Sequence, residues 1–141
     1  MRTIKFRGFN AKNNQWLYGS HIINRGKHFV APDEFADDKT WEDYEVEPDS
    51  VGEFTGLTDK SGTPIYEGDI IDVHIPCNSI GKEEHRTRVV VWNEKCARFE
   101  YQDKRGDCIA DSVGAKYNVV YYEVVGNIHD DKKLLEKGGE Q

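Results

Sequence analysis

Apolar and polar residues alternate with a period of two through most of this chain, which predicts short β-strands rather than helices. In the first such segment, Ile4 and Phe6 alternate with the charged side chains of Lys5 and Arg7. Polar turns rich in asparagine and glycine separate this segment from the next two. We expect an N-terminal β-meander whose strands lie at residues 3–9, 16–23 and 28–31.

Residues 33–50, called the acidic segment below, lose this alternation. They lack helical periodicity, and acidic runs of this kind are commonly solvated loops. Phe35, Trp41 and Tyr44 could anchor the segment to the meander, and a brief strand is expected at residues 44–47. A surface that combines aromatic and acidic side chains can bind a basic partner, so these three aromatic residues form a candidate partner surface.

The period-two pattern returns in the second half of the chain. Strands are expected at residues 51–55, 65–66, 69–75, 88–93, 97–102 and 119–128. Gly126 predicts a bulge or bend in the last of these strands. Residues 108–118 favour no particular element, and residues 130–137 predict a short C-terminal helix with two glycines after its end.

The order of segments from Tyr66 onward fits an SH3-like barrel, in which a Gly-Asp turn leads into a strand, a hairpin and a closing strand. We therefore expect a mainly β protein with two parts that form one compact unit. Residues 1–50 supply the N-terminal β-meander and the acidic segment. Residues 51–141 supply a C-terminal SH3-like small barrel on which the meander packs.

The stretch from Val51 to Val73 holds the densest turn chemistry in the chain. Aspartate bonds the local backbone and glycine reaches positive φ, so both residue types are typical of tight turns. The predicted structural turn residues are Asp59, Gly62, Gly68 and Asp69. Glu67 and Asp69 could be paired carboxylates for acid–base chemistry. Turn geometry accounts for both residues without catalysis, and we favour that interpretation.

A length of 141 residues suits one domain, or two small subdomains that share a core. The net charge of −7 is unevenly spread, because residues 1–32 carry only basic charges and residues 33–72 are strongly acidic. We favour neutralisation between neighbouring strands over a dipolar surface. The sequence has neither an apolar run long enough to cross a bilayer nor an apolar signal core. We therefore expect a cytoplasmic protein without membrane contacts.

The three cysteines, Cys77, Cys96 and Cys108, cannot all pair within one chain and have no CxxC spacing, so reduced thiols are expected. A zinc site would need His74 or His85 to join them, and no ligand pair has finger-like spacing. The histidines form no HxH or HExxH motif, and nucleotide-binding and nucleophile motifs are missing. We expect no enzyme, cofactor or metal. A cryptic hydrolase or metalloprotein is one alternative.

Nucleic-acid binding is the other alternative. Small β-barrels can bind nucleic acids through basic side chains interleaved with aromatic ones. The candidate contacts are Arg86, Arg88, Arg98, Lys104 and Arg105, which alternate with Trp92, Phe99 and Tyr101. A sequence pI near 5.2 argues against this alternative, since typical nucleic-acid-binding domains are basic.

Several short blocks, taken in order along the chain, resemble the YopX family of phage and prophage proteins. These blocks are IKFR (4–7), FN (9–10), YG (18–19), FTGLTDK (54–60), Gly62, IYEGDI (65–70), VW (91–92) and EVVGNI (123–128). The resemblance covers almost the whole chain. Departures are modest: Glu53 stands where the family often has glutamine, and His129 where it often has tyrosine. The acidic segment matches no family block.

This resemblance implies a phage-derived, mostly β protein that acts in the bacterial cytoplasm, and it supplies no catalytic residues. The sequence also lacks a catalytic constellation and carries an aromatic-acidic segment. We therefore predict a non-enzymatic accessory protein that binds an unidentified host or phage protein, with homo-oligomerisation as one further form of binding.

Overall fold

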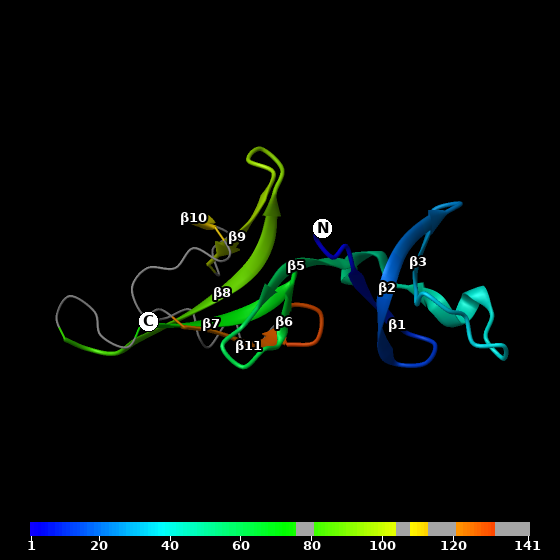
Figure 1. The fold of residues 1–141 in the computed structure, drawn as a ribbon, viewed down its shortest axis with the longest axis horizontal. Coiled ribbons are helices and arrows are strands. Elements are labelled where there is room, and N and C mark those ends of the chain that lie inside the picture. The colour runs from blue at the N-terminus through cyan, green and yellow to red at the C-terminus, as the bar shows by residue number, and fades with distance from the viewer. Residues whose placement is uncertain (76–80, 104–107, 113–120, 132–141) are drawn as a thin grey trace. The chain divides into compact units, whose positions relative to one another are not determined.

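The protein is mainly β and contains two antiparallel sheets, as the period-two patterns predicted (Figure 1). This computed structural model describes residues 1–75, 81–103, 108–112 and 121–131. The first half contains β1 (Phe6–Asn10), β2 (Gln15–Asn24), β3 (Lys27–Ala31), the 3₁₀ helix η1 (Trp41–Tyr44), β4 (Glu45–Val46), the 3₁₀ helix η2 (Pro48–Ser50) and β5 (Gly52–Thr58). The second half contains β6 (Pro64–Tyr66), β7 (Asp69–Ile75), β8 (Glu84–Asn93), β9 (Arg98–Gln102), β10 (Cys108–Ser112) and β11 (Tyr121–Asn127).

The chain divides within β5 into two compact units, residues 1–56 and residues 57–141. The first part of β5 pairs with β1, where Phe6 lies opposite Glu53. The strand then continues past the division, and β6 is its neighbour on the other side. The boundary expected after residue 50 lies just before this strand, whereas the structural division lies inside it.

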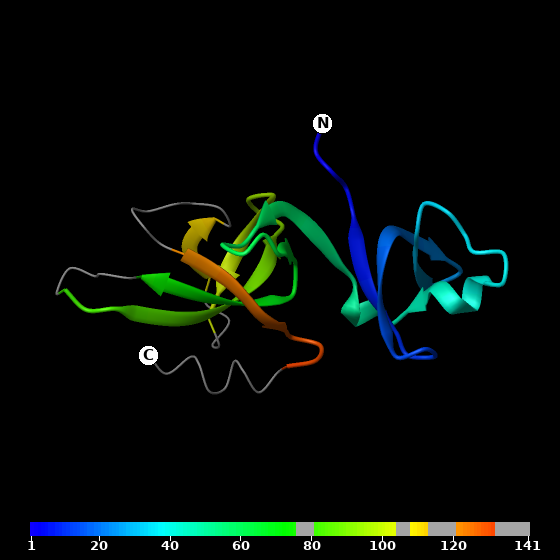
Figure 2. The same ribbon diagram turned by 60° about the horizontal axis from the view of Figure 1, so that its bottom comes forward.

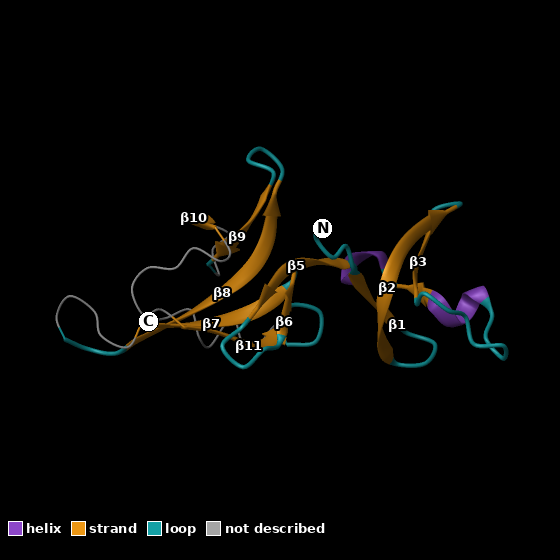
Figure 3. Cartoon of the chain, viewed as in Figure 1, coloured by secondary structure: helices purple, strands orange, loops and turns teal. Residues whose placement is uncertain are grey.

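The N-terminal unit contains the strand order β4-β3-β2-β1-β5. Its buried apolar side chains come from β3, η1 and β4, and they are Phe29, Val30, Ala31, Tyr44 and Val46. The acidic segment is more ordered than a loop, since η1, β4 and η2 lie within it (Figure 3). Two 3₁₀ helices of three and four residues are too short to produce a periodic pattern, which explains why the sequence did not indicate them.

The C-terminal unit contains the five-stranded order β10-β9-β8-β7-β11, in which β11 returns to lie beside β7 (Figures 1 and 2). The register of β11 against β7 shifts between Val124 and Gly126, which confirms the bulge predicted at Gly126. One apolar cluster forms the core on one face of this sheet. Its buried members are Ile65, Ile71, Val90 and Tyr101, with Val73, Phe99, Tyr122 and Val124 packed against them.

Several elements differ from the sequence prediction. The strand expected at residues 88–93 begins earlier, at Glu84, because β7 supplies a pairing partner as far as Ile75. β10 forms in a stretch whose pattern favoured no element. The expected helix at residues 130–137 lies outside the described residues except for a turn that reaches Asp130. In the described sheet, β10 and β11 are edge strands rather than partners in a closed barrel. Within the same residues, no helix has the length and apolarity needed to span a bilayer.

Two histidines form a cross-strand pair in the N-terminal unit. His21 Nε2 lies 2.9 Å from His28 Nδ1, and the two rings are stacked with centroids 5.1 Å apart. Burial, together with the neighbouring His28, lowers the pKa of His21. Protonation of His21 is therefore less favourable in the folded protein than in the unfolded chain, where a histidine titrates near about 6.5.

We predict that the free energy of unfolding falls as the pH drops below about 6.5, because the unfolded chain then binds more protons than the folded protein. The contribution of His21 to the free energy of unfolding is complete above that pH. It is lost as the pH falls toward the pKa of His21 in the folded protein, which is the lower of the two. Urea denaturation at pH 7.5, 6.5 and 5.5 measures the slope. His21→Gln should flatten it. An equal slope in the wild type and His21→Gln would contradict this assignment.

Candidate functional sites

The three residues predicted as a partner surface lie together and are called the aromatic cluster below. Phe35 stacks on Tyr44 with ring centroids 4.6 Å apart, and Trp41 meets Phe35 edge-on at 4.9 Å. Trp41 also contacts the buried ring of Phe29, in β3, at 5.5 Å. Tyr44 is buried, whereas 43% of Phe35 and 49% of Trp41 are exposed. The aromatic cluster is therefore anchored in the core and open to solvent.

Hydrogen bonds from β1 fix the backbone that carries this cluster. Asn10 is almost completely buried, and its Nδ2 donates to the carbonyl oxygens of Asp43 at 3.1 Å and Glu45 at 2.7 Å. The backbone N–H of Phe9 donates to the hydroxyl of Ser50 at 2.7 Å. These bonds bridge more than thirty residues of sequence at each end of β4, so the acidic segment is held by specific polar contacts.

Asp43 closes the first turn of η1. Its Oδ2 accepts the backbone N–H of Thr40 at 2.9 Å, and its Oδ1 accepts from Lys12 Nζ at 3.1 Å. The hydrogen bond from Thr40 and then that from Lys12 hold the pKa of Asp43 well below its usual range. Asp43 is therefore charged at neutral pH and points back into its own turn.

The segment that carries the aromatic cluster exposes many carboxylates. The exposed carboxylates of the segment belong to Asp33, Glu34, Asp37, Asp38, Glu42, Glu47 and Asp49. A cavity of about 300 Å³ opens beside η1 and β4, lined by Asn10, Ala11, Lys12, Glu42, Glu45, Val46 and Glu47. The aromatic cluster, several exposed carboxylates and this cavity therefore all involve the segment around η1 and β4 in the N-terminal unit.

The basic side chains predicted to contact nucleic acid are divided between two faces of the C-terminal sheet. The described members of that set are Arg86, Arg88 and Arg98, and the other two, Lys104 and Arg105, lie outside the described residues. Arg86 and Arg88 are on the same face as the core residue Val90, because they alternate with it along β8. Arg98 lies opposite Asn93 and is therefore on the other face.

Acidic neighbours compensate two of these charges. Arg98 donates two hydrogen bonds to Glu100, with Nε 3.2 Å and a terminal nitrogen 3.0 Å from Oε2. The hydrogen bonds that Arg98 donates to this carboxylate raise the pKa of Arg98, and the bonds donated by Asn93 and Arg98 lower the pKa of the buried Glu100. Arg86 likewise bonds to Glu84. This arrangement does not favour a phosphate-binding surface.

Aromatic side chains of the same hairpin also divide between core and surface. Tyr101 is buried in the C-terminal core, with 3% of its surface exposed. Trp92 is 41% exposed and meets Phe99 edge-on at 4.9 Å. Only Trp92, among the three, presents a largely open ring for stacking on a base.

Asp59 links the turn after β5 to the distant strand β11. Its Oδ1 accepts the backbone N–H groups of Ser61 at 2.8 Å and Thr63 at 2.9 Å. Its Oδ2 accepts the backbone N–H of Val124 at 3.0 Å. Burial acts to raise the pKa of Asp59, but these three bonds outweigh it, so the pKa is lowered. Gly62 reaches the φ of +86° that this turn requires.

The second predicted turn precedes β7. The buried Asp69 accepts the backbone N–H of Tyr66 at 2.7 Å. Gly68 has a φ of +91°, and its N–H donates to the carbonyl oxygen of Val90 at 2.8 Å. Both turns therefore use an aspartate as an acceptor for backbone N–H groups.

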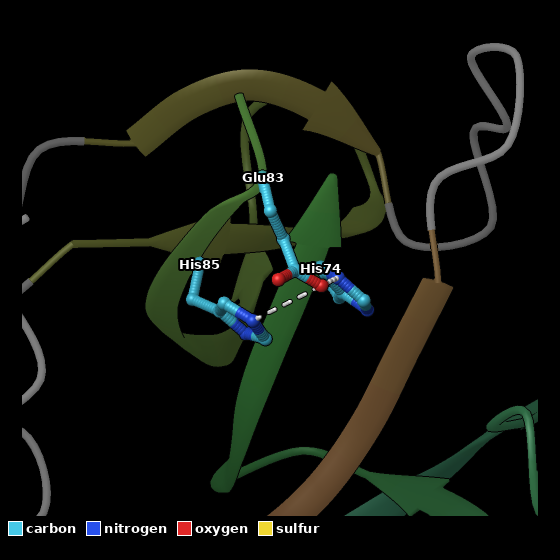
Figure 4. Close-up of side chains that lie close together, drawn as sticks. All are labelled: His74, Glu83 and His85. Carbon is cyan, nitrogen blue, oxygen red and sulfur yellow. Dashed lines mark hydrogen bonds and ion pairs between the residues drawn. The ribbon is translucent and has the colours of Figure 1, made fainter. Parts of the chain in front are cut away.

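His74, Glu83 and His85 come together on the C-terminal sheet in a group that motif spacing did not predict, called the histidine cluster below (Figure 4). His74 in β7 lies opposite His85 in β8, and their rings stack with centroids 4.3 Å apart and planes 8° from parallel. His74 Nε2 hydrogen-bonds to Glu83 Oε1, and His85 Nε2 lies 3.9 Å from the same oxygen. One ligand atom from each residue lies within 4.8 Å of the others.

A further carboxylate orients one of these rings. His85 Nδ1 lies 2.9 Å and 3.2 Å from the two carboxylate oxygens of Asp72, which precedes His74 by two residues in β7. The side chains of Glu83 and His85 are 60% and 50% exposed, and that of His74 is 21% exposed. The cluster is therefore open to solvent.

Strand alternation was the signal that could have found this cluster. Alternation along residues 69–75 places His74 on the face away from Ile71 and Val73, and in the structure both of those residues pack in the core. The zinc site considered from the sequence required cysteine ligands, whereas the described Cys96 is exposed and outside the cluster. The register of β7 against β8, which brings His85 opposite His74, could not be read from motif spacing.

Comparisons with known proteins agree with this architecture. The family model described as YopX protein matches residues 5–136. Among solved structures, the crystal structure of protein EF1440 from Enterococcus faecalis is similar, with a TM-score of 0.58 and 19% sequence identity over 96% of this chain and 99% of that chain. That similarity concerns the fold alone. No curated protein sequence matches the chain. Because the family model spans nearly all of the sequence, the chain belongs to the YopX family.

Proposed function

We propose that this protein is a non-enzymatic binding module that recognises another protein through the aromatic cluster. The observation that carries this proposal is the exposure of two large rings, those of Phe35 and Trp41. Phe35 is held by its stacking on Tyr44, and Trp41 by its contacts with Phe35 and Phe29. Aromatic side chains that are held in place lose little conformational entropy on binding, and they dominate many protein interfaces.

The charge around the cluster indicates the chemistry of the partner. The acidic segment that carries the cluster has seven exposed carboxylates, and Lys39 is the single basic residue of that segment. A partner segment that carries arginine or lysine beside apolar side chains would fit, because guanidinium groups stack on tryptophan faces and are attracted by carboxylates. The expected interface has an aromatic centre and an acidic rim.

Membership of the YopX family supports a proposal about where this binding takes place. We propose a phage- or prophage-derived accessory protein that acts in the bacterial cytoplasm on a host or phage protein. We also propose an SH3-like barrel as the architecture of the C-terminal unit. The strand order supports it, since β7, β8, β9 and β10 follow one another and β11 returns beside β7.

The experiment compares capture of partners from a bacterial lysate by the wild type and by Trp41→Ala, with the captured proteins identified by mass spectrometry. We expect at least a tenfold loss of the specific partner in Trp41→Ala, in line with the roughly 2 kcal/mol cost of removing an interface hot spot. Asp37→Asn/Asp38→Asn leaves the core untouched and should weaken capture more strongly at low salt than at high salt.

Trp92→Ala is the matched control, because Trp92 is similarly exposed but belongs to the C-terminal unit. It should capture the partner as the wild type does. Equal recovery by all four proteins would refute the proposal. Sedimentation of the purified protein separates the case in which the partner is a second copy of this chain, since dimerisation would then weaken in Trp41→Ala.

A further inference from the structure

We propose that His74, Glu83 and His85 form a binding site for a divalent transition-metal cation of the Zn²⁺ class. This site lies in the C-terminal unit and is independent of the protein-binding function proposed for the N-terminal unit. Imidazole nitrogens and a carboxylate oxygen are ligands that such cations prefer, and two histidines with one glutamate make a ligand set known for zinc.

The orientation of the three donors supports a shared cation. Nε2 of both histidines faces one carboxylate oxygen of Glu83. Because the carboxylate of Asp72 accepts a hydrogen bond from the Nδ1–H of His85, the neutral form of His85 carries a lone pair on Nε2. That lone pair and the Glu83 oxygen are both acceptors, 3.9 Å apart. A cation between them would satisfy both atoms.

The distances require only local adjustment. The ligand atoms lie within 4.8 Å of one another, and tetrahedral bonds of about 2.0–2.1 Å place ligand atoms roughly 3.4 Å apart. The required shift is on the order of 1 Å, which side-chain rotations can supply because Glu83 and His85 are at least half exposed. The two histidines are already held opposite each other by the β7–β8 register.

Asp72 acts in this site as a positioning residue. A carboxylate bonded to the remote nitrogen of a histidine fixes its tautomer and its ring orientation, and such partners are commonly worth 10–100-fold in metal affinity. The Asp72 carboxylate has this relation to His85 Nδ1, at 2.9 Å. With three protein ligands, a fourth coordination position faces solvent, so water or an external ligand can occupy it.

The test is calorimetric titration of the untagged, chelator-treated full chain with Zn²⁺. We expect one ion per wild-type chain. His74→Gln, His85→Gln and Glu83→Gln should each weaken binding about 100-fold or more. His129→Gln is the matched control. His129 also lies beside a carboxylate, that of Asp130, but it is in the turn after β11 and is not part of the histidine cluster. Its affinity should stay within about threefold of the wild type. Asp72→Ala should weaken binding about 10–100-fold, and Asp72→Asn should restore most of the loss.

Two further readouts make every outcome decisive. Thermal melts without metal test whether each variant folds, and Glu83→Gln, at an exposed position, keeps the test valid if a histidine variant does not. The absorption of the Co²⁺ complex should show nitrogen and oxygen ligands without thiolate charge transfer, which distinguishes this site from binding at a cysteine. Stoichiometric binding that survives all three ligand substitutions, a thiolate spectrum, or no binding by the wild type would overturn the proposal.

Discussion

Replacing Gly19 with alanine is expected to lower the free energy of unfolding of the N-terminal unit by about 3 kcal/mol or more. A Cβ at this position would lie 2.0 Å from the carbonyl oxygen of Ala31 and 2.7 Å from its carbonyl carbon. Both are backbone atoms of the neighbouring strand β3, so a side-chain rotation cannot relieve the clash. The φ of +153° at Gly19 adds backbone strain for any residue with a Cβ.

Gly26→Ala provides the matched control for this prediction. Gly26 lies in the turn between β2 and β3 with a φ of +78°, and a Cβ there would meet no atom within 4 Å. Its substitution should cost only the backbone strain of about 1 kcal/mol. Urea denaturation followed by circular dichroism measures both variants. If the two variants lost the same stability, the close approach of β2 and β3 would not be the cause.

Because β3 carries Phe29 against Trp41, Gly19→Ala should also disturb the aromatic cluster. Tryptophan fluorescence reports this directly, and partner capture should fall in parallel with the folded fraction. This separates an indirect loss of binding from the direct loss expected for Trp41→Ala, which should leave the sheet intact.

The second large effect on stability is expected for Asp59→Ala, which should lower the free energy of unfolding by roughly 3 kcal/mol. The substitution leaves three backbone N–H groups without their acceptor, and one of them belongs to Val124 in the distant strand β11. Hydrogen bonds to a charged acceptor are among the stronger ones, and unsatisfied buried donors carry a desolvation cost. Chemical denaturation at neutral pH measures the loss.

Two variants test the mechanism of this effect. Asp59→Asn keeps one good acceptor oxygen and should lose less stability than Asp59→Ala. Asp37→Ala removes an exposed carboxylate from the acidic segment and should change stability by less than about 0.5 kcal/mol. Amide exchange at Val124 should accelerate in Asp59→Ala. Protection of that amide at the wild-type level would show that the bond to Asp59 does not hold β11.

Much of the fold could be read from local patterns. The strands of the N-terminal meander, β7 and β9 follow from period-two alternation, because a half-buried strand exposes one face and buries the other. The bulge beside Gly126 followed from the unusual place of a glycine in a β-branched strand. The 3₁₀ helices η1 and η2 did not follow, since tertiary hydrogen bonds donated by Asn10 and by the backbone N–H of Phe9 hold their segment in place.

The sequence by itself determined the family, the mainly β class and the clustering of aromatic and acidic residues in one segment, because these depend on residue type and local order. Tertiary structure alone decided which side chains meet. It separated Arg98 from Arg86 by strand alternation in β8 and β9, and it brought His85 opposite His74 through the register of β7 and β8. A register depends on the pairing of whole strands, and a shift of one residue would place every side chain on the opposite face.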